Sequence, residues 1–324
     1  MPSQVALINN SGGVLCCGNL VADILVQPVE EPGWGKTTWV EHIEIGIGGN
    51  GANTSYTLAK LGRPVRLLSS VGDDAFGRAM LVKLQAAGVD TTYVECSDTA
   101  PTPTSVVLVH LDGKRALLHR PGSSRDAFAR GIELTDELVA GISHLHLANI
   151  FSLKLFQDHA RDLLLQARKR GLWTSMDTGW DPRGLWMETI KPCLPLTDLL
   201  FVNEDEALQL TGTSEPVRAA EILRQHSASD VVIKLGPQGS YMRSSDDEFC
   251  TPGFRVACVD TTGAGDCFAG GFIAALQNDF DHRDAARFAN AAGALNVQKL
   301  GAVNGVLNFS ETVEWLNRNL TAPG

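Results

Sequence analysis

Apolar runs of strand length recur along this chain and alternate with amphipathic stretches of helical period. The runs cover residues 14–20, 65–71, 145–150, 172–177, 199–203 and 231–236. Residues 153–171, between two of these runs, combine helical spacing of apolar side chains with a final glycine, which predicts a helix and its end. Strands that alternate with helices predict βαβ units, and therefore an α/β fold with a mostly parallel sheet covered on both faces. Residues 263–321 have a mostly helical pattern.

Two segments have a different pattern. Residues 37–48 alternate polar and apolar positions, which is typical of a strand with one solvated face. Residues 104–120 have the pattern of a β-hairpin, with Asp112 and Gly113 in the turn. We interpret these pieces as a small β lid inserted into a single α/β domain that spans residues 1–324. The expected lid comprises two segments, about 24–47 and 102–122.

The overall composition excludes some classes of function. The chain has 324 residues, of which 44% are hydrophobic and 20% are charged, which is ample for a large core. Its formal net charge is −10, and it contains no run of Lys or Arg. Because nucleic acids and anionic membranes are bound through basic patches, we expect neither as a partner. An anionic substrate would have to be bound by a small local site.

The cysteines and the N-terminal segment predict the compartment. There are seven cysteines, an odd number, and no C-x-x-C motif, which favours a reduced protein. Residues 1–13 lack the charged and apolar regions of a secretory signal. No window approaches the roughly 18 consecutive apolar residues of a membrane-spanning helix. We therefore expect a cytoplasmic protein.

The stretch VDTTGAGDCFAGGF, residues 259–272, places two glycines where a helix is expected to begin. Glycine there costs about 1 kcal/mol relative to alanine, so the pair indicates that a ligand approaches the backbone closely. Helix N-termini bind anions such as phosphate through their free N–H groups and their partial positive charge. Gly263, Ala264 and Gly265 are therefore a candidate anion cradle, with Thr262 as the expected N-cap.

Asp266 follows directly and would lie in the first helical turn beside the bound anion. A carboxylate repels a phosphate unless it has a chemical task, and the task that fits is to accept a proton from a hydroxyl group that attacks phosphorus. The alternative is that Asp266 only complements the helix dipole and that the glycines permit tight packing. The motif alone leaves both interpretations open. No P-loop lysine follows the glycines, which excludes that motif.

A second glycine cluster, GIGGNGANTSYTLAKLG, occupies residues 46–62. With Asp73 downstream it resembles a dinucleotide-binding fingerprint. We reject that interpretation because the preceding residues 41–47 are half polar, whereas the first strand of a dinucleotide fold is buried on both faces. Asn50 and Asn53 offer donors and acceptors suited to neutral hydroxyl groups. The alternative is a glycine-rich turn in which the asparagines cap a helix.

Two separated motifs together resemble the signatures of the ribokinase-like carbohydrate kinases, the PfkB family. The first is residues 47–62 leading to VGDDAFG, residues 71–77, and the second is residues 259–272. The resemblance covers essentially the whole chain. It implies a three-layer α/β/α domain with a mostly parallel central sheet and an inserted β lid. It also implies a kinase that uses ATP and Mg²⁺ to phosphorylate a hydroxyl group.

The resemblance assigns roles to individual residues. Asp266 matches the general base, and the amides of Gly263, Ala264 and Gly265 match the anion hole for the phosphoryl group. The residues that match ATP-binding positions are Asn203, Lys234, Gly236, Gly265 and Asn290. Glu206 matches a residue that organises Mg²⁺ through water.

Local explanations compete with four of these assignments. Asn203 and Glu206 have the spacing of a capping box, which by itself is the better interpretation. Lys234 lies in an otherwise apolar strand and could extend to solvent instead of reaching phosphate. Asn290 could be an ordinary residue on a helix surface.

For the acceptor, the resemblance implies contacts from Asp23, in residues 18–23, and from Gly49, Asn50 and Asn53 of the first motif. We also expect Arg120, in the lid segment 119–124, to meet a carboxylate or another polar group of the substrate. A turn residue after a strand is the alternative for Asp23, and a solvated hairpin residue is the alternative for Arg120 and its neighbour His119. Ribokinase itself has other residues at the positions of Val21 and Asn50, so the resemblance does not specify ribose.

The family often has a monovalent-cation site, such as one for K⁺, beside the anion hole. The positions that match it are Asp260, Thr262 and Gly301, the last in the loop 297–305. Carbonyl ligands leave little trace in a sequence, so this cation is an expectation of the resemblance only.

The sequence therefore predicts an ATP-dependent kinase for a small sugar or sugar-like molecule. A nucleoside kinase of the same fold and a sugar-binding regulatory protein without catalysis are the alternatives. The resemblance also implies a homodimer formed lid to lid, which the half-apolar strands 37–48 and 104–120 would suit. The alternative is that these strands cover only their own active site.

Overall fold

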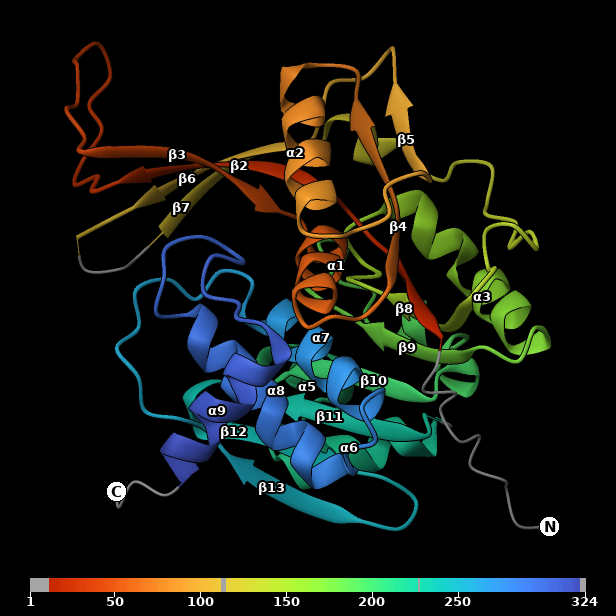
Figure 1. Cartoon of the computed structure of the whole chain (residues 1–324). Coiled ribbons are helices and arrows are strands. Elements are labelled where there is room, and N and C mark those ends of the chain that lie inside the picture. The colour runs from red at the N-terminus through yellow and green to blue at the C-terminus, as the bar shows by residue number, and fades with distance from the viewer. Residues whose placement is uncertain (1–11, 112–114, 227, 321–324) are drawn as a thin grey trace.

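The core of the molecule is a nine-stranded sheet whose strand order is β13-β12-β11-β10-β9-β8-β1-β4-β5 (Figure 1). The computed structural model describes residues 12–111, 115–226 and 228–320. The strands are β1 (Gly13–Cys17), β4 (Val65–Gly72), β5 (Val94–Ser97), β8 (Ile142–Leu147), β9 (Trp173–Asp177), β10 (Leu199–Asn203), β11 (Asp230–Lys234), β12 (Gly239–Arg243) and β13 (Glu248–Pro252). The pairings from β5 to β11 are parallel, and β12 and β13 form an antiparallel edge.

Both faces of this sheet are buried because successive strand residues face opposite helical layers. In β1, Val14 and Cys16 belong to one apolar cluster, whereas Leu15 and Cys17 belong to the other. This explains why the central strands are continuous apolar runs in the sequence.

The helices form the two outer layers. They are α1 (Asn50–Lys60), α2 (Ala75–Ala86), α3 (Lys154–Lys169), α4 (Met187–Ile190), α5 (Glu204–Thr211), α6 (Pro216–Gln225), α7 (Ala264–Leu276), α8 (His282–Asn296) and α9 (Phe309–Leu320). Buried side chains of α1, α2, α7, α8 and α9 share one cluster, and those of α3 to α6 share the other. The three-layer α/β/α arrangement predicted from the sequence is confirmed.

A separate four-stranded sheet, the lid, projects from the upper left of the molecule in Figure 1. Its order is β3-β2-β6-β7, with β2 (Val21–Gln27), β3 (His42–Gly48), β6 (Thr104–Val109) and β7 (Arg115–Arg120). The strand predicted from residue 37 begins later, at His42, and the segment between β2 and β3 is exposed. The predicted turn at Asp112 and Gly113 lies outside the described residues.

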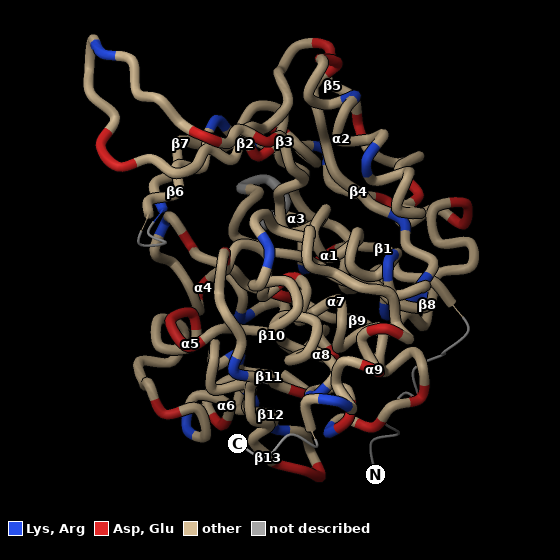
Figure 2. The backbone as a smooth tube through the Cα atoms, turned by 60° about the vertical axis from the view of Figure 1, so that its left-hand side comes forward, with Lys and Arg blue, Asp and Glu red and all other residues tan. Residues whose placement is uncertain are grey.

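The predicted long elements agree with the structure, whereas several short strands were not predicted. The run 199–203 is β10, and residues 263–321 contain α7, α8 and α9. Strands β5 and β13 lie at the two edges of the sheet, where exposed positions weaken the apolar pattern, and β12 is buried but begins with Gly239 and Ser240. Among the described helices, none has the length and apolar character needed to cross a bilayer. Lys and Arg are interspersed with Asp and Glu along the tube in Figure 2.

Candidate active site

The turn before α7 has a backbone shape that requires glycine. Gly263 is the N-cap, with φ of 72°, and a Cβ atom there would collide with the carbonyl oxygen of Ala302. The expected N-cap, Thr262, is wrong, because no side chain caps this helix and the Thr262 hydroxyl donates to Asp260 instead, at 2.6 Å. The Ala264 amide makes a long hydrogen bond to Thr261 O, at 3.3 Å. The other N–H groups of the first turn have no partner within the helix, which leaves them available to a ligand.

Two cavities meet at this turn. The first, here called the nucleotide cavity, has a volume of about 500 Å³, and its lining includes Lys234, Gly236, Ala264, Gly265, Phe268 and Asn290. The second, the acceptor cavity, has a volume of about 300 Å³, and its lining includes Asp23, Asn50, Asn53, Arg115, Gly263 and Asp266. The turn is therefore a wall that the two cavities share. Ala264 and Gly265 face the nucleotide cavity, and Gly263 and Asp266 face the acceptor cavity.

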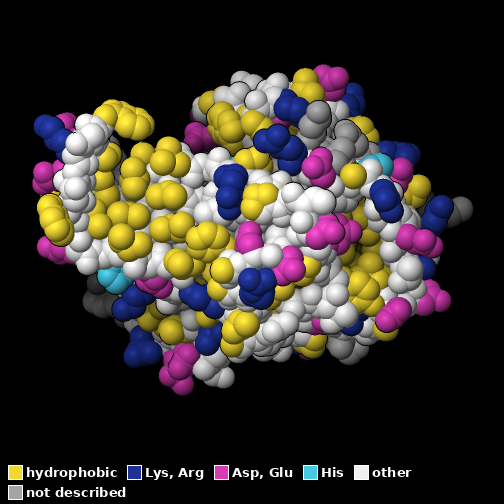
Figure 3. All heavy atoms as spheres, turned by 90° about the horizontal axis from the view of Figure 1, so that it is seen from above, with side chains coloured by type: hydrophobic (Ala, Val, Ile, Leu, Met, Phe, Trp, Pro, Cys, Tyr) yellow, Lys and Arg dark blue, Asp and Glu magenta, His cyan; other side chains and the backbone are white. Residues whose placement is uncertain are grey.

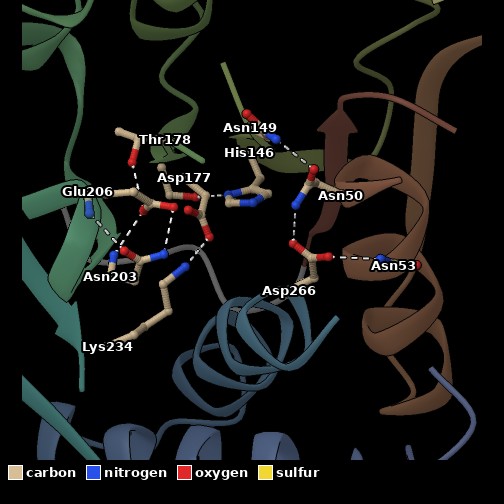
Figure 4. Close-up of polar contacts among 11 residues, drawn as sticks. Asn50, Asn53, His146, Asn149, Asp177, Thr178, Asn203, Glu206, Lys234 and Asp266 are labelled. Atoms are coloured by element: carbon tan, nitrogen blue, oxygen red, sulfur yellow. Dashed lines mark hydrogen bonds and ion pairs between the residues drawn. The ribbon is translucent and has the colours of Figure 1, made fainter. Parts of the chain in front are cut away.

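The Asp266 carboxylate is held between two asparagine amides of α1, as Figure 4 shows. Asn50 Nδ2 donates to Oδ1, and Asn53 Nδ2 donates to Oδ2, each at 2.8 Å. Burial raises the pKa of Asp266 from 3.8 to about 6, although both amides favour the charged form. A carboxyl with this pKa is ionised at neutral pH, yet it accepts a proton more readily than an exposed one does.

A third asparagine, not predicted from the sequence, orients this pair. Asn149 Nδ2 donates to Asn50 Oδ1 at 2.7 Å, so Asn149, Asn50 and Asp266 form a chain of hydrogen bonds (Figure 4). Asn149 has a positive φ of 55°, which is uncommon for a residue with a side chain. Its place directly after the β8 strand was the signal available in the sequence.

Asp23, in β2, enters the acceptor cavity from the lid side. It is 8% exposed, and burial raises its pKa to about 6. A Cβ atom at Gly48, on the neighbouring strand, would collide with the Asp23 carboxylate, so this glycine makes room for it. Gly49 follows and lines the same cavity. The acceptor cavity thus brings together the four motif residues predicted to bind substrate, namely Asp23, Gly49, Asn50 and Asn53.

Arg120, the fifth predicted substrate residue, does not line this cavity. Its guanidinium donates to Thr102 O and to Thr104 Oγ1, both at 3.1 Å, and it borders a different hollow on the other face of the lid. Strand alternation explains the difference, because Arg115 and Leu117 of β7 face the acceptor cavity and Arg120 has the opposite parity.

A buried charge network adjoins the nucleotide cavity. Lys234 Nζ forms an ion pair with Asp177 Oδ2 at 2.7 Å, with side chains that are 13% and 8% exposed. Burial by itself would lower the pKa of Lys234, but the carboxylates of Asp177 and Glu206 outweigh it and raise the pKa. Lys234 therefore stays charged, and a Cβ atom at Gly265 would lie 3.3 Å from its Nζ. This places a fixed positive charge beside the anion cradle.

Asn203 and Glu206 form the capping box that their spacing predicted (Figure 4). Glu206 Oε2 accepts from the Asn203 amide at 2.9 Å and from Thr178 Oγ1 at 3.0 Å, while Oε1 accepts from Asn203 Nδ2 at 2.8 Å. Burial raises the pKa of Glu206. Because its oxygens are already bonded, this carboxylate fits a metal ion held through water better than one bound directly.

Asn290 is buried, at 8% exposure, so the alternative of a helix-surface residue is wrong. Its Nδ2 donates to Ser240 Oγ at 3.3 Å and to Thr251 O at 3.2 Å, and it lines the nucleotide cavity together with Gly236. Most of the remaining lining of this cavity is glycine, alanine, valine and phenylalanine. A flat apolar group such as an adenine ring suits such walls.

The residues expected to bind a monovalent cation are close together but are bonded to one another. Asp260 Oδ1 accepts from the Thr262 amide at 2.9 Å and from the Thr262 hydroxyl at 2.6 Å, and Oδ2 accepts from the Gly301 amide at 2.9 Å. At this carboxylate Gly301 presents its N–H group, which is not a cation ligand. Arg115 Nη1 lies 3.1 Å from Asp260 Oδ1. Because both oxygens are bonded and the charge is paired, the Asp260 carboxylate does not fit a metal cation bound directly to it.

Comparison with known proteins agrees with this geometry. The model of the pfkB family carbohydrate kinases matches residues 14–308. The chain is 28% identical over 308 residues to a ribokinase of Haemophilus influenzae, covering 92% of this chain and 96% of that protein. It is 29% identical over 286 residues to a 2-dehydro-3-deoxygluconokinase of Bacillus subtilis, covering 85% and 88%.

A similar solved structure is that of an Escherichia coli putative ribokinase II in complex with ATP and Mg²⁺. Its TM-score is 0.84 at 25% identity, and the match covers 95% of this chain and 99% of that one. The shared-wall arrangement of the two cavities and the family match over residues 14–308 lead to one conclusion: this chain belongs to the PfkB family of carbohydrate kinases, which are ATP-dependent phosphotransferases.

Proposed function

We propose that this protein transfers the γ-phosphate of ATP to a hydroxyl group of a small sugar or sugar-like acceptor, with Asp266 as the general base. The observation that carries the proposal is the wall shared by the two cavities. Ala264 and Gly265 line the nucleotide cavity, whereas Gly263 and Asp266 line the acceptor cavity. A phosphoryl group bound at the amides of this turn would lie between donor and acceptor, as in-line transfer requires.

The chemistry follows from the residues of the turn. An acceptor hydroxyl beside Asp266 gives its proton to the carboxylate while its oxygen bonds to the γ-phosphorus. The bond from that phosphorus to the bridging oxygen breaks, which yields ADP and the phosphorylated acceptor. First-turn amides and Lys234 stabilise the negative charge of the transferring group. A magnesium ion, held by the phosphates and through water by Asp177 and Glu206, would neutralise charge on the phosphate oxygens.

The acceptor class follows from the polarity of its cavity. The groups that face it include two carboxylates, of Asp23 and Asp266, and amide side chains, among them Asn50 and Asn53. Such groups suit an acceptor with several hydroxyls. Because Asp23 and Asp266 both add negative charge and the charge of Arg115 is paired with Asp260, a neutral polyol fits better than a phosphorylated sugar.

A panel assay tests the proposal. Formation of ADP is measured with ATP and Mg²⁺ against neutral sugars, sugar acids and nucleosides, each with a no-acceptor control. We expect turnover with one or more sugars or sugar acids. Turnover with nucleosides alone would instead identify a nucleoside kinase. Saturable binding of a sugar without any ADP formation across the panel would identify a regulatory binding protein.

We also propose that two copies associate through the outer face of the lid. The paired positions of the four strands place an aliphatic set on that face: Ile24, Val26, Ile43, Ile45, Val106, Leu108, Ala116 and Leu118. Ile43 and Leu118 are each 64% exposed, and Figure 3 shows a broad hydrophobic area over the lid. The set itself contains no charged residue. Arg120 lies at the end of the same face, where its guanidinium is bonded to Thr102 and Thr104, so two copies can meet over the aliphatic set without burying a charge.

Molar mass in solution tests this association. The double change Ile43→Glu with Leu118→Glu should convert a dimer to a monomer, because it buries four charges at a two-fold interface. Val82→Glu is the matched control, since Val82 is 63% exposed but lies on α2, outside the lid. A wild-type protein that is monomeric at micromolar concentration would contradict the proposal.

A further inference from the structure

Within the part of the chain that the structure describes, Arg115 forms the only ion pair between the lid and residues 260–262, which directly precede the anion cradle. It begins β7 and faces inward, into the acceptor cavity. Its Nη1 lies 3.1 Å from Asp260 Oδ1 and also donates to the Thr262 hydroxyl, while Nη2 donates to Thr261 Oγ1 at 2.9 Å. One guanidinium thus contacts three consecutive residues, 260, 261 and 262, directly before Gly263.

The Asp260 carboxylate needs a counter-charge. Its side chain is 0% exposed, whereas that of Arg115 is 30% exposed. Besides Arg115, the groups bonded to Asp260 are the neutral amides and hydroxyl of Thr262 and Gly301. Among the described residues, Arg115 is the cation within ion-pair distance of Asp260. A buried carboxylate without such a partner is strongly destabilising, so this pair is required as long as no other cation reaches the site.

Other groups that could ligate a small cation here are also occupied. Asn296 Nδ2 donates to the carbonyl oxygens of Thr262 and Ala302, each at 3.0 Å. The Gly301 amide, not its carbonyl, faces Asp260. A monovalent ion bound to Asp260 Oδ1 would compete with the guanidinium of Arg115, and one bound to Oδ2 would compete with the Gly301 amide.

The contact also depends on the position of the lid. Leu25, Val107 and Val109 of the lid are buried in a small apolar cluster against Leu300, in the loop that carries Gly301. Arg115 pairs with Val109 across β6 and β7, so it lies at the edge of the same cluster. In the structure the guanidinium reaches Asp260 while these apolar contacts hold the lid against the loop, so separating the lid from the loop would break the ion pair.

We propose that the guanidinium of Arg115 takes the place of a monovalent cation at Asp260. Through this contact, the position of the lid is coupled to the conformation of the anion cradle, residues 263–265. Arg115 acts as a positioning residue, through residues 260–262, and not by contact with the transferring group. The predicted effect on kcat/KM rests on the proposed kinase function. The structural part, in which the ion pair of Arg115 with Asp260 holds the lid in place, is independent of that function.

The kinetic test compares KCl with tetramethylammonium chloride at equal ionic strength. In the wild type, kcat/KM should change less than about twofold between the two salts. Arg115→Ala should lower kcat/KM by about tenfold or more, within the range typical of coupled sites. Millimolar guanidinium, and to a smaller degree K⁺, should restore part of it. Arg115→Lys should recover little, because an ammonium cannot bond three acceptors in one plane.

Arg120→Ala is the matched control, because Arg120 lies five residues away on the same strand but bonds Thr102 and Thr104 outside the cavity. This variant should keep wild-type kinetics. Activation of the wild type by K⁺ of more than about fivefold would overturn the proposal, and so would a loss in Arg115→Ala that neither guanidinium nor K⁺ restores.

Hydrogen exchange of the lid provides the second readout, measured without nucleotide or acceptor. Amides of β2 and β6 should exchange faster in Arg115→Ala than in the wild type, and guanidinium should slow them again, while Arg120→Ala should match the wild type. Equal exchange in all three proteins would overturn the proposal. If the wild type shows no phosphoryl transfer, the kinase function fails and this exchange experiment alone decides the role of Arg115.

Discussion

Substitution of Asp266 by asparagine tests both the chemistry and the electrostatics of the site. Asparagine has nearly the same shape but cannot take the proton of an acceptor hydroxyl. Loss of a general base typically costs on the order of 10²–10⁴ in rate, so kcat should fall by that amount. Asp181→Asn is the control, because Asp181 is also a buried carboxylate, bonded to the amides of residues 183, 185 and 186, but lies outside both cavities.

The pH dependence of stability gives a magnitude that can be worked out from the structure. Burial raises the pKa of Asp266 from 3.8 to about 6. The folded protein therefore binds this proton more tightly than the unfolded chain does. As pH rises from about 4 to about 6, the free energy of unfolding should fall by about 3 kcal/mol from this group and then stay level, since one pKa unit is about 1.4 kcal/mol.

Asp266→Asn removes this term. The difference in unfolding free energy between variant and wild type, measured by urea titration at several pH values, should therefore shift in favour of the variant by about 3 kcal/mol across that interval. The hydrogen bonds lost from Asn50 and Asn53 add an offset that does not depend on pH. A difference that is flat with pH would refute the assignment of a raised pKa to Asp266.

Activity should show a matching acid limb. Below about pH 6, kcat/KM of the wild type should fall about tenfold per pH unit, because Asp266 becomes protonated. Asp23 also has a pKa of about 6, so the rate profile alone does not identify the group. The comparison of unfolding free energies does identify the group, because Asp23 is present in both the wild type and Asp266→Asn. Near-wild-type kcat in Asp266→Asn would refute the general-base role.

Three further predictions concern single changes. Lys234→Met should lower the free energy of unfolding by about 3–5 kcal/mol in urea titration, because it leaves Asp177 buried without its partner; adding Asp177→Asn should restore stability but not kcat. Gly263→Ala should lower the melting temperature and raise the KM for ATP, because a Cβ atom collides with the Ala302 carbonyl; unchanged values would contradict the tight turn. Asp74→Ala should cost about 0.5–2 kcal/mol in urea titration without changing the KM for either substrate, because Asp74 caps α2 and bonds residue 102, outside both cavities.

Local features of the chain were predictable because they depend on neighbours in sequence. Apolar runs identified the central strands, since burial on both faces requires them. The capping box of Asn203 and Glu206 was predictable because both partners lie within one helical turn. The glycines at 263 and 265 indicated a close backbone approach for the same reason.

The direction of a side chain on an exposed strand was harder to predict. Arg120 and Arg115 are both cations in β7, and the family motif does not extend to either. A shift of one residue in register exchanges the two faces of a strand, and the lid has apolar residues on both faces, such as Val106 on one and Val107 on the other, so the pattern does not fix the register. The substrate role predicted for Arg120 therefore fell on the wrong face.

The order of the central strands and main helices and the glycine turn were predictable from the sequence alone, and the sequence also identified Asp266 as the candidate base. The tertiary structure decided which distant residues meet: Lys234 with Asp177 at a separation of 57, Asn149 with Asn50 at 99, and Arg115 with Asp260 at 145. Parallel strands bring their carboxyl ends to one edge of the sheet, and the lid closes over that edge. Contacts between such distant residues depend on strand order and register, which produce no periodic pattern in the sequence.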